Sequence, residues 1–209
     1  MVLHINLKKK GVIKINKGFW DTYIPDYIID LSEKYIDNKE YGIIVLPEGT
    51  DFTDLGFKKQ DSKLAAFFEP LFPDINDIYK WYKETFSLPN MTHIKGFLVF
   101  SIESMKRNLI KPSAFSDLIR DYSLMNDIKY LIIHECRHAQ QNRLLRNEFK
   151  ESKIIYSLID LDKVRFDLLE YDAIRYAFSK TTNSKYTGVN YDKAFIESMH
   201  YLYDKELCL

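Results

Sequence analysis

The sequence predicts an α+β fold in which a small mixed sheet in the N-terminal half packs on a helical C-terminal half. The placement of proline and glycine is the main reason. All 6 prolines lie within the first 112 residues, and Gly188 is the only glycine between Ser113 and Leu209. Because both residue types interrupt helices, a long stretch without them is predominantly helical. Short runs of β-branched and aromatic residues in the first half predict strands there.

Length and composition indicate one globular domain. The chain has 209 residues, of which 46% are hydrophobic, and we expect residues 1–112 to form its mixed α/β part and residues 113–209 its helical part. Thirty basic residues balance 30 acidic ones, so no overall field favours nucleic acid or an anionic membrane as a partner. With 2 cysteines, and no apolar run of signal-peptide or membrane-span length, we expect a cytoplasmic protein.

The elements of the first half follow from local patterns. Strands are predicted at Gly11–Ile15, Tyr41–Leu46 and Thr92–Ile102. Apolar residues recur every three or four positions in Asp26–Tyr35 and Ile75–Phe86, which predicts two helices. The turn signal Pro47-Glu48-Gly49 begins a predicted loop over residues 47–62.

The second half is predicted to form three or four helices. A short one covers Ser113–Leu124, a long one runs from Asn126 or Asp127 to Phe149, and a third covers Ser152–Phe178. After a loop at Thr181–Gly188, Asn190 caps a last helix. Phe195, Met199 and Leu202 are expected to line one face of that helix.

The long helix contains the segment His134-Glu135-Cys136-Arg137-His138. Histidines four residues apart lie on one helical face, separated by about 6 Å of rise, so both imidazoles can reach one Zn²⁺ at about 2.0–2.1 Å. Glu135 lies at the edge of that face, where a carboxylate can take a proton from a metal-bound water. These residues predict a zinc site with His134 and His138 as metal ligands and Glu135 as catalytic base.

A catalytic zinc takes a third protein ligand and keeps one position open. The downstream candidates are Asp160, Asp162, Asp167, Glu170, Asp172 and His200. Glu170 is favoured because Ala173 and Ala177 continue its helical stripe, and small residues allow a close approach to an antiparallel helix. Asp172 lies on nearly the opposite side of the helix from Glu170, and we expect it to pair with Arg175 or to face water.

His134-Glu135-Cys136-Arg137-His138 followed by Glu170-Tyr171-Asp172-Ala173 resembles the zincin metallopeptidases, and within them the gluzincin branch. It is similar to small soluble metallopeptidases of phages and bacteria. The resemblance implies His134, His138 and Glu170 as ligands, Glu135 as base, and a sheet whose edge strand binds extended peptide. Thr92–Ile102 is our candidate for that edge strand.

The sequence departs from the gluzincin pattern in two places. Many gluzincins carry an aspartate four residues after the ligand glutamate, where it orients a histidine; Ile174 occupies that place here, and Asp167 is an alternative. No oxyanion-stabilising residue is defined, and the choice stays open among Tyr176, Tyr186, Tyr191 and His200.

Three neighbours of the histidines have structural interpretations. Cys136 is expected to be a buried small residue, and Arg137 to pair with a carboxylate on the neighbouring helix. Gln141 lies on the histidine face, where it contacts substrate, supports a ligand or faces solvent.

The predicted function is zinc-dependent hydrolysis of peptide bonds in a peptide or protein substrate. The alternative is a non-catalytic binding or regulatory protein with a retained metal site, or a protease with a single protein target. A fourth protein ligand, such as Asp167 or His200, would favour a structural site over an open catalytic one.

Overall fold

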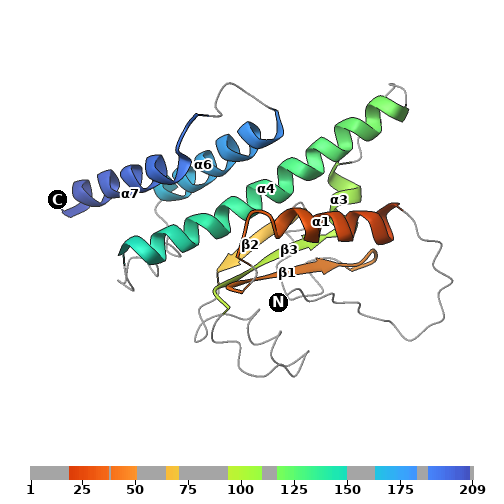
Figure 1. Ribbon diagram of the computed structural model, residues 1–209, viewed down its shortest axis with the longest axis horizontal. Helices are drawn as coiled ribbons and strands as arrows, with labels where there is room; N and C mark the ends of the chain where they lie inside the picture. Colours follow the sequence, from red (N-terminus) through yellow and green to blue (C-terminus); the bar gives the residue numbers. More distant parts are fainter. Residues whose placement is uncertain are drawn as a thin grey trace.

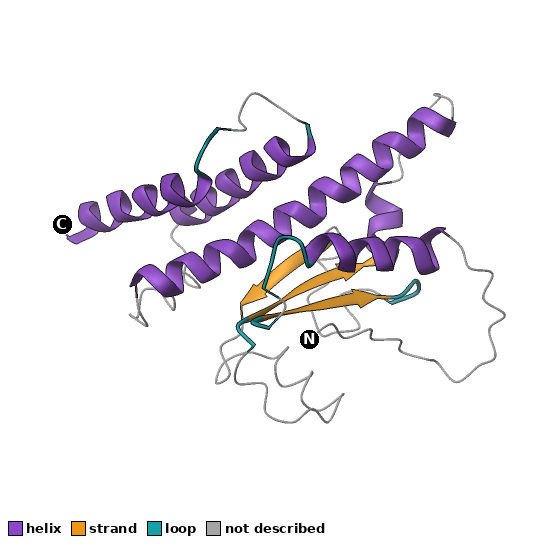
Figure 2. Cartoon of the chain, viewed as in Figure 1, coloured by secondary structure: helices purple, strands orange, loops and turns teal. Residues whose placement is uncertain are grey.

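The computed structural model describes residues 19–37, 39–50, 65–70, 94–109, 117–149, 163–182 and 188–207. It shows an α+β architecture, with a three-stranded mixed sheet from the N-terminal half and long helices from the C-terminal half (Figures 1 and 2), which confirms the predicted fold class. The predicted strand at 11–15, the predicted helix at 75–86 and residues 51–62 of the predicted loop lie outside the described residues.

The sheet contains β1 (Tyr41–Leu46), β2 (Ala66–Pro70) and β3 (Gly96–Ser101) in the order β1-β3-β2. Strand β3 runs parallel to β1 and antiparallel to β2. The predicted strand at 41–46 is confirmed. The strand predicted at 92–102 is shorter, because the chain enters a helix at Ile102.

Our assignment of Thr92–Ile102 as the edge strand is wrong, since β3 lies between the other two strands. All of its residues are buried, and its continuous apolar run is typical of a strand covered on both faces. Strand β2, which we did not predict, forms one edge of the described sheet. Its five residues are too few for a clear alternation pattern, and they end at a proline.

Helix α1 (Ile24–Ser32), preceded by a π-helical turn, η1 (Phe19–Tyr23), covers one face of the sheet (Figure 1). It is shifted from the predicted range of 26–35 and begins with Pro25 in its first turn, where the missing N–H breaks no helical hydrogen bond. Ile28 of α1 shares a hydrophobic core with Ile43, Leu98 and Ile132. A short helix, α3 (Ile102–Leu109), follows β3 directly.

Helix α4 (Asp117–Phe149) is one continuous helix of 33 residues. The prediction that a separate long helix starts at Asn126 or Asp127 is therefore wrong. Neither proline nor glycine occurs in this stretch, and Asp127 faces solvent inside the helix instead of capping it. On the opposite side, Ile132, Cys136 and Ala139 are buried in the core shared with α1 and the sheet.

Helices α6 (Lys163–Thr181) and α7 (Tyr191–Leu207) pack against α4, and α6 runs antiparallel to it (Figure 1). The predicted start of α6 at Ser152 lies outside the described residues. Ala173 and Ala177 are fully buried, as expected for a close helix contact. Asn190 caps α7, because its Oδ1 accepts a hydrogen bond from the backbone N–H of Lys193 at 3.1 Å. None of the described helices has the length and apolar character needed to span a membrane.

Candidate metal centre

Helices α4 and α6 bring His134, His138 and Glu170 together. The two Nε2 atoms are 3.1 Å apart. Glu170 Oε2 lies 3.3 Å from His134 Nε2, and its Oε1 lies 3.2 Å from His138 Nε2. The three residues form a cluster whose ligand atoms all lie within 4.8 Å of one another. The third candidate ligand favoured by the sequence thus lies beside the two histidines.

The spacing of these atoms fits a tetrahedral metal ion. Four ligands at about 2.0–2.1 Å from zinc lie about 3.3 Å from each other. The two Nε2 atoms are 3.1 Å apart, and each lies 3.2–3.3 Å from one of the two Glu170 carboxylate oxygens, so the three side chains are spaced as ligands of one such ion. Two imidazole nitrogens and a carboxylate form a ligand set that zinc accepts, as do several other divalent transition metals.

The electrostatics of the cluster favour a bound cation. Hydrogen bonds from His134 and His138 hold the pKa of Glu170 well below its usual range, so this carboxylate is ionised. Burial lowers the pKa of His138, but the hydrogen bond to Glu170 and the charge of Glu135 outweigh that effect and raise it. A metal ion would replace the proton that these groups otherwise share.

Glu135 is buried beside the cluster, with 6% of its surface exposed. Burial raises the pKa of its carboxyl group, while the two histidines and a hydrogen bond from the backbone of Phe68 act in the opposite direction without cancelling the rise. The carboxyl group is therefore a better proton acceptor than an exposed glutamate.

The contact between Glu135 and Phe68 places the edge of β2 next to the site. Ser101 N donates to Ala65 O at 3.1 Å, so these two residues form a hydrogen-bonded pair. Hydrogen-bonded and non-hydrogen-bonded pairs alternate along an antiparallel ladder, and Phe68, three residues after Ala65, belongs to a non-hydrogen-bonded pair. Phe68 pairs with Leu98 at a position where the N–H and C=O of the residue point away from β3. Within the described sheet, the edge strand beside the candidate metal centre is accordingly β2 and not Thr92–Ile102.

Tyr130, which sequence reasoning missed, lies one helical turn before His134. Its ring stacks on the His134 imidazole with centroids 6.1 Å apart and an interplanar angle of 27°. Burial, and then the charge of Glu170, raise the pKa of its hydroxyl. The four-residue spacing before His134 was the available signal, because residues four apart share a helical face.

The tyrosine and histidine candidates for oxyanion stabilisation lie elsewhere or outside the described residues. Tyr176 packs on the Arg137 guanidinium at 4.7 Å and edge-on against Tyr191 at 5.3 Å. His200 hydrogen-bonds Glu148 near the end of α4 at 2.7 Å. Tyr186 is not among the described residues.

The remaining ligand candidates do not join the cluster within the described side chains. Asp172 binds Arg137 Nε at 2.7 Å, so the prediction that it pairs with Arg175 or faces water is wrong. Its partner is the buried arginine that helix packing brings across from α4. Asp160 and Asp162, like the side chain of Asp167, lie outside the described part of the chain. Ile174 is 46% exposed and cannot orient a histidine.

Gln141 and Arg137 form the polar support behind His138. Gln141 is buried, and its Oε1 lies 2.9 Å from His138 Nδ1. Its Nε2 donates to Leu169 O at 2.9 Å and to Asp172 Oδ2 at 2.8 Å. Arg137 also donates to Asp192 Oδ1 at 2.5 Å, which confirms its predicted pairing with carboxylates of the neighbouring helices.

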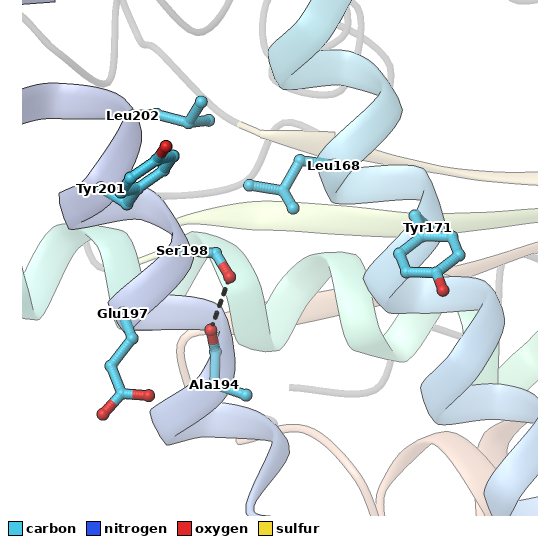
Figure 3. A pocket seen from close by; sticks show the side chains of 7 residues that line it. All are labelled: Leu168, Tyr171, Ala194, Glu197, Ser198, Tyr201 and Leu202. Carbon is cyan, nitrogen blue, oxygen red and sulfur yellow. Dashed lines mark hydrogen bonds between the residues drawn. The ribbon is translucent and has the colours of Figure 1, made fainter. Parts of the chain in front are cut away.

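A separate shallow groove lies between α6 and α7 (Figure 3). It is lined by Leu168, Tyr171, Ala194, Glu197, Ser198, Tyr201 and Leu202. The Ser198 hydroxyl is engaged with the carbonyl of Ala194 at 2.9 Å. None of the four predicted site residues lines this groove.

Comparison of the chain with family models, with curated proteins and with solved structures gives no match.

Proposed function

We propose that the protein is a zinc-dependent peptidase that acts on a peptide or protein substrate, as the gluzincins do. The observation that carries the proposal is the cluster of His134, His138 and Glu170, in which the two Nε2 atoms are 3.1 Å apart and each lies 3.2–3.3 Å from a Glu170 oxygen, with the Glu135 carboxyl group buried beside it. A metal-binding cluster alone could be structural, whereas a neighbouring carboxylate with a raised pKa adds a proton acceptor.

His134, His138 and Glu170 would hold the ion. Zinc, when bound, would polarise the scissile carbonyl and make an attacking water more acidic. The low pKa of Glu170 keeps its carboxylate charged, which partly neutralises a divalent cation and strengthens its binding.

Glu135 would act as the general base. Its carboxylate takes a proton from the attacking water and passes it to the leaving amine. The hydrogen bond from the Phe68 backbone supports this role, because it restrains the carboxyl group at the edge of the site. Burial moves the pKa of the Glu135 carboxyl group toward neutral pH, and a group with such a pKa can both accept and release a proton efficiently.

Strand β2 would align the substrate. The ladder register directs the N–H and C=O groups of Ala66 and Phe68 away from β3. Because the Phe68 N–H binds Glu135, the groups that remain for a substrate within the described sheet are the Phe68 C=O and both groups of Ala66. An extended peptide can add to such an edge through backbone hydrogen bonds. The edge lies beside Glu135, so a bound peptide would pass the cluster.

Tyr130 would supply a hydrogen-bond donor for the same reaction. Its ring stacks on His134, and its hydroxyl is protonated at neutral pH, with a pKa that burial and the charge of Glu170 raise further. A donor aimed at the oxygen that becomes negative in the transition state typically contributes a factor of about 10²–10³ to kcat.

The non-catalytic alternative would need a closed site. Among the described residues the cluster has three ligand side chains. Of the two fourth ligands that we considered, His200 is engaged by Glu148, and the side chain of Asp167 lies outside the described part of the chain. An open fourth position is what catalysis requires. We therefore place the enzyme ahead of a binding protein with a structural metal.

The test combines metal analysis with peptide cleavage. Purified protein is expected to bind zinc stoichiometrically, His134→Ala to lose it, and His200→Ala to retain it as the matched control. Glu135→Gln is expected to retain zinc while cleavage of a complex peptide mixture, followed by mass spectrometry, falls by about 10²–10⁴-fold. Absence of zinc from the wild-type protein, or unchanged zinc in His134→Ala, would refute the proposal.

A further inference from the structure

The side chain of Gln141 has a defined orientation. Its amide nitrogen faces two acceptors, the carbonyl oxygen of Leu169 and the carboxylate oxygen of Asp172, at 2.9 and 2.8 Å. A flipped amide would place its oxygen against both of them, and oxygen cannot donate. The Oε1 atom therefore faces His138, where it accepts a hydrogen bond at 2.9 Å.

Asp172 holds the amide of Gln141 in this orientation. Its Oδ2 accepts from Arg137 Nε at 2.7 Å as well as from Gln141, and its side chain is only 11% exposed. Arg137 is fully buried, so the pair is ionic and well shielded from water. A charged oxygen at this place holds the NH₂ group of Gln141 more firmly than a neutral acceptor would.

The orientation of the amide favours one tautomer of His138. Since Gln141 Oε1 only accepts, it favours a proton on His138 Nδ1. Glu170 Oε1, 3.2 Å from Nε2, competes for the proton as long as no metal is bound, whereas a metal bound through the Nε2 lone pair leaves the proton on Nδ1, facing Gln141. For His134, in contrast, Nδ1 is buried and has no hydrogen-bond partner within the described part of the chain.

We infer that Gln141, held by Asp172, is a positioning residue that keeps His138 in the Nδ1–H tautomer and aims its Nε2 at the metal position. The inference rests on the proposed metal site and deepens it. It also explains how the site can lack the aspartate that many gluzincins carry where Ile174 stands here. The support for His138 comes from Gln141 on α4 and not from the position four residues after Glu170.

Two variants of neighbouring glutamines separate this role from general packing. Gln141→Leu removes the acceptor for His138. Gln140→Leu is the matched control, because Gln140 bonds Tyr35 O at 2.7 Å and Arg137 at 3.1 Å instead of a histidine. In chelator competition, zinc affinity is expected to fall about 10–100-fold in Gln141→Leu and to change much less in Gln140→Leu. Equal affinities of the two variants would overturn the inference.

A second measurement needs no metal. In a metal-free Glu170→Ala variant the competing acceptor at His138 Nε2 is removed, and long-range ¹H–¹⁵N correlation spectra recorded at alkaline pH report the tautomer of the neutral His138 ring. His138 is expected as Nδ1–H, and an Nε2–H ring would overturn the inference even if Gln141→Leu does not fold. If the wild-type chain binds no zinc, the proposed function fails, while the tautomer of His138 still decides this inference.

Discussion

Small residues determine how closely the segments of this protein approach one another. Ala173 and Ala177 are fully buried on α6, on the helical stripe of Glu170, and they let this helix pack close to α4. Gly42 has the corresponding role in the sheet, where a Cβ atom at this position would lie 2.3 Å from Cε1 of Phe97. The absence of a side chain at such sites is what makes the contacts possible.

Gly42→Ala is expected to destabilise the protein by about 1–3 kcal/mol, because the Phe97 ring sits in a buried strand and has to shift. The free energy of unfolding in urea measures the effect. Gly188→Ala is the control, since no atom of the described residues other than its chain neighbours lies within 4 Å of its added Cβ, and its change should stay within about 0.5 kcal/mol. Equal stability of both variants would contradict the proposed close contact.

Cys136 is expected to be unreactive in the folded protein. The residue is fully buried, as predicted from the sequence, and burial raises the pKa of its thiol to about 12. Because the thiolate is the reactive form, iodoacetamide at pH 8 should label the peptide containing Cys136 only after denaturation, as followed by mass spectrometry. Rapid labelling of this peptide under native conditions would show that the α4–α1 core opens.

At the scale of elements, the ends and the continuity of the helices follow from local chemistry. Helix α4 remains unbroken over 33 residues because nothing in its sequence interrupts it, and Asn126 and Asp127 are tolerated inside it. Helix α7 starts where Asn190 accepts the N–H of Lys193. A side chain that can cap a helix does so only where the preceding chain leaves the helical conformation.

Asn190→Ala should destabilise the protein by about 1 kcal/mol, because the N–H of Lys193 loses its acceptor. Asn190→Ser, which retains a capping oxygen, is the control and should remain close to wild type in thermal unfolding followed by circular dichroism. An alanine variant as stable as the serine variant would mean that this cap contributes nothing.

At the scale of the whole molecule, Arg137 joins three helices. It lies on α4 and pairs with Asp172 of α6 and Asp192 of α7, and its guanidinium lies 4.7 Å from the ring of Tyr176. The same Asp172 holds Gln141 and, through it, His138. The packing of the helical half is thus connected to the candidate metal centre through one ion-pair network.

Arg137→Met should destabilise the protein by about 3–5 kcal/mol, because Asp172 is left nearly buried without its charged partner. Arg175→Met is the control: Arg175 is exposed and lies over the Tyr171 ring at 5.5 Å, so its replacement should cost no more than about 1 kcal/mol. Denaturant unfolding of both variants gives the comparison, and equal losses would contradict a special role of the buried network.

Features with a local cause were predictable from the sequence. The strand at Tyr41–Leu46, the cap at Asn190 and the shared face of His134 and His138 depend on residues a few positions apart, within the period of a strand or helix. The predictions failed where the outcome depended on distant partners. The edge assignment of Thr92–Ile102 failed because β2, a strand too short to be recognised, pairs with the far side of β3.

The sequence by itself determined the α+β class and the presence of two imidazoles and a carboxylate on one helix. It also favoured Glu170, through the small residues that follow it. Only the tertiary structure decided that Glu170 reaches both histidines, that β2 borders Glu135, and that Gln141 and Asp172 support His138. The physical reason is that helical periodicity is a property of the local chain, whereas these contacts arise from the packing of segments far apart in sequence.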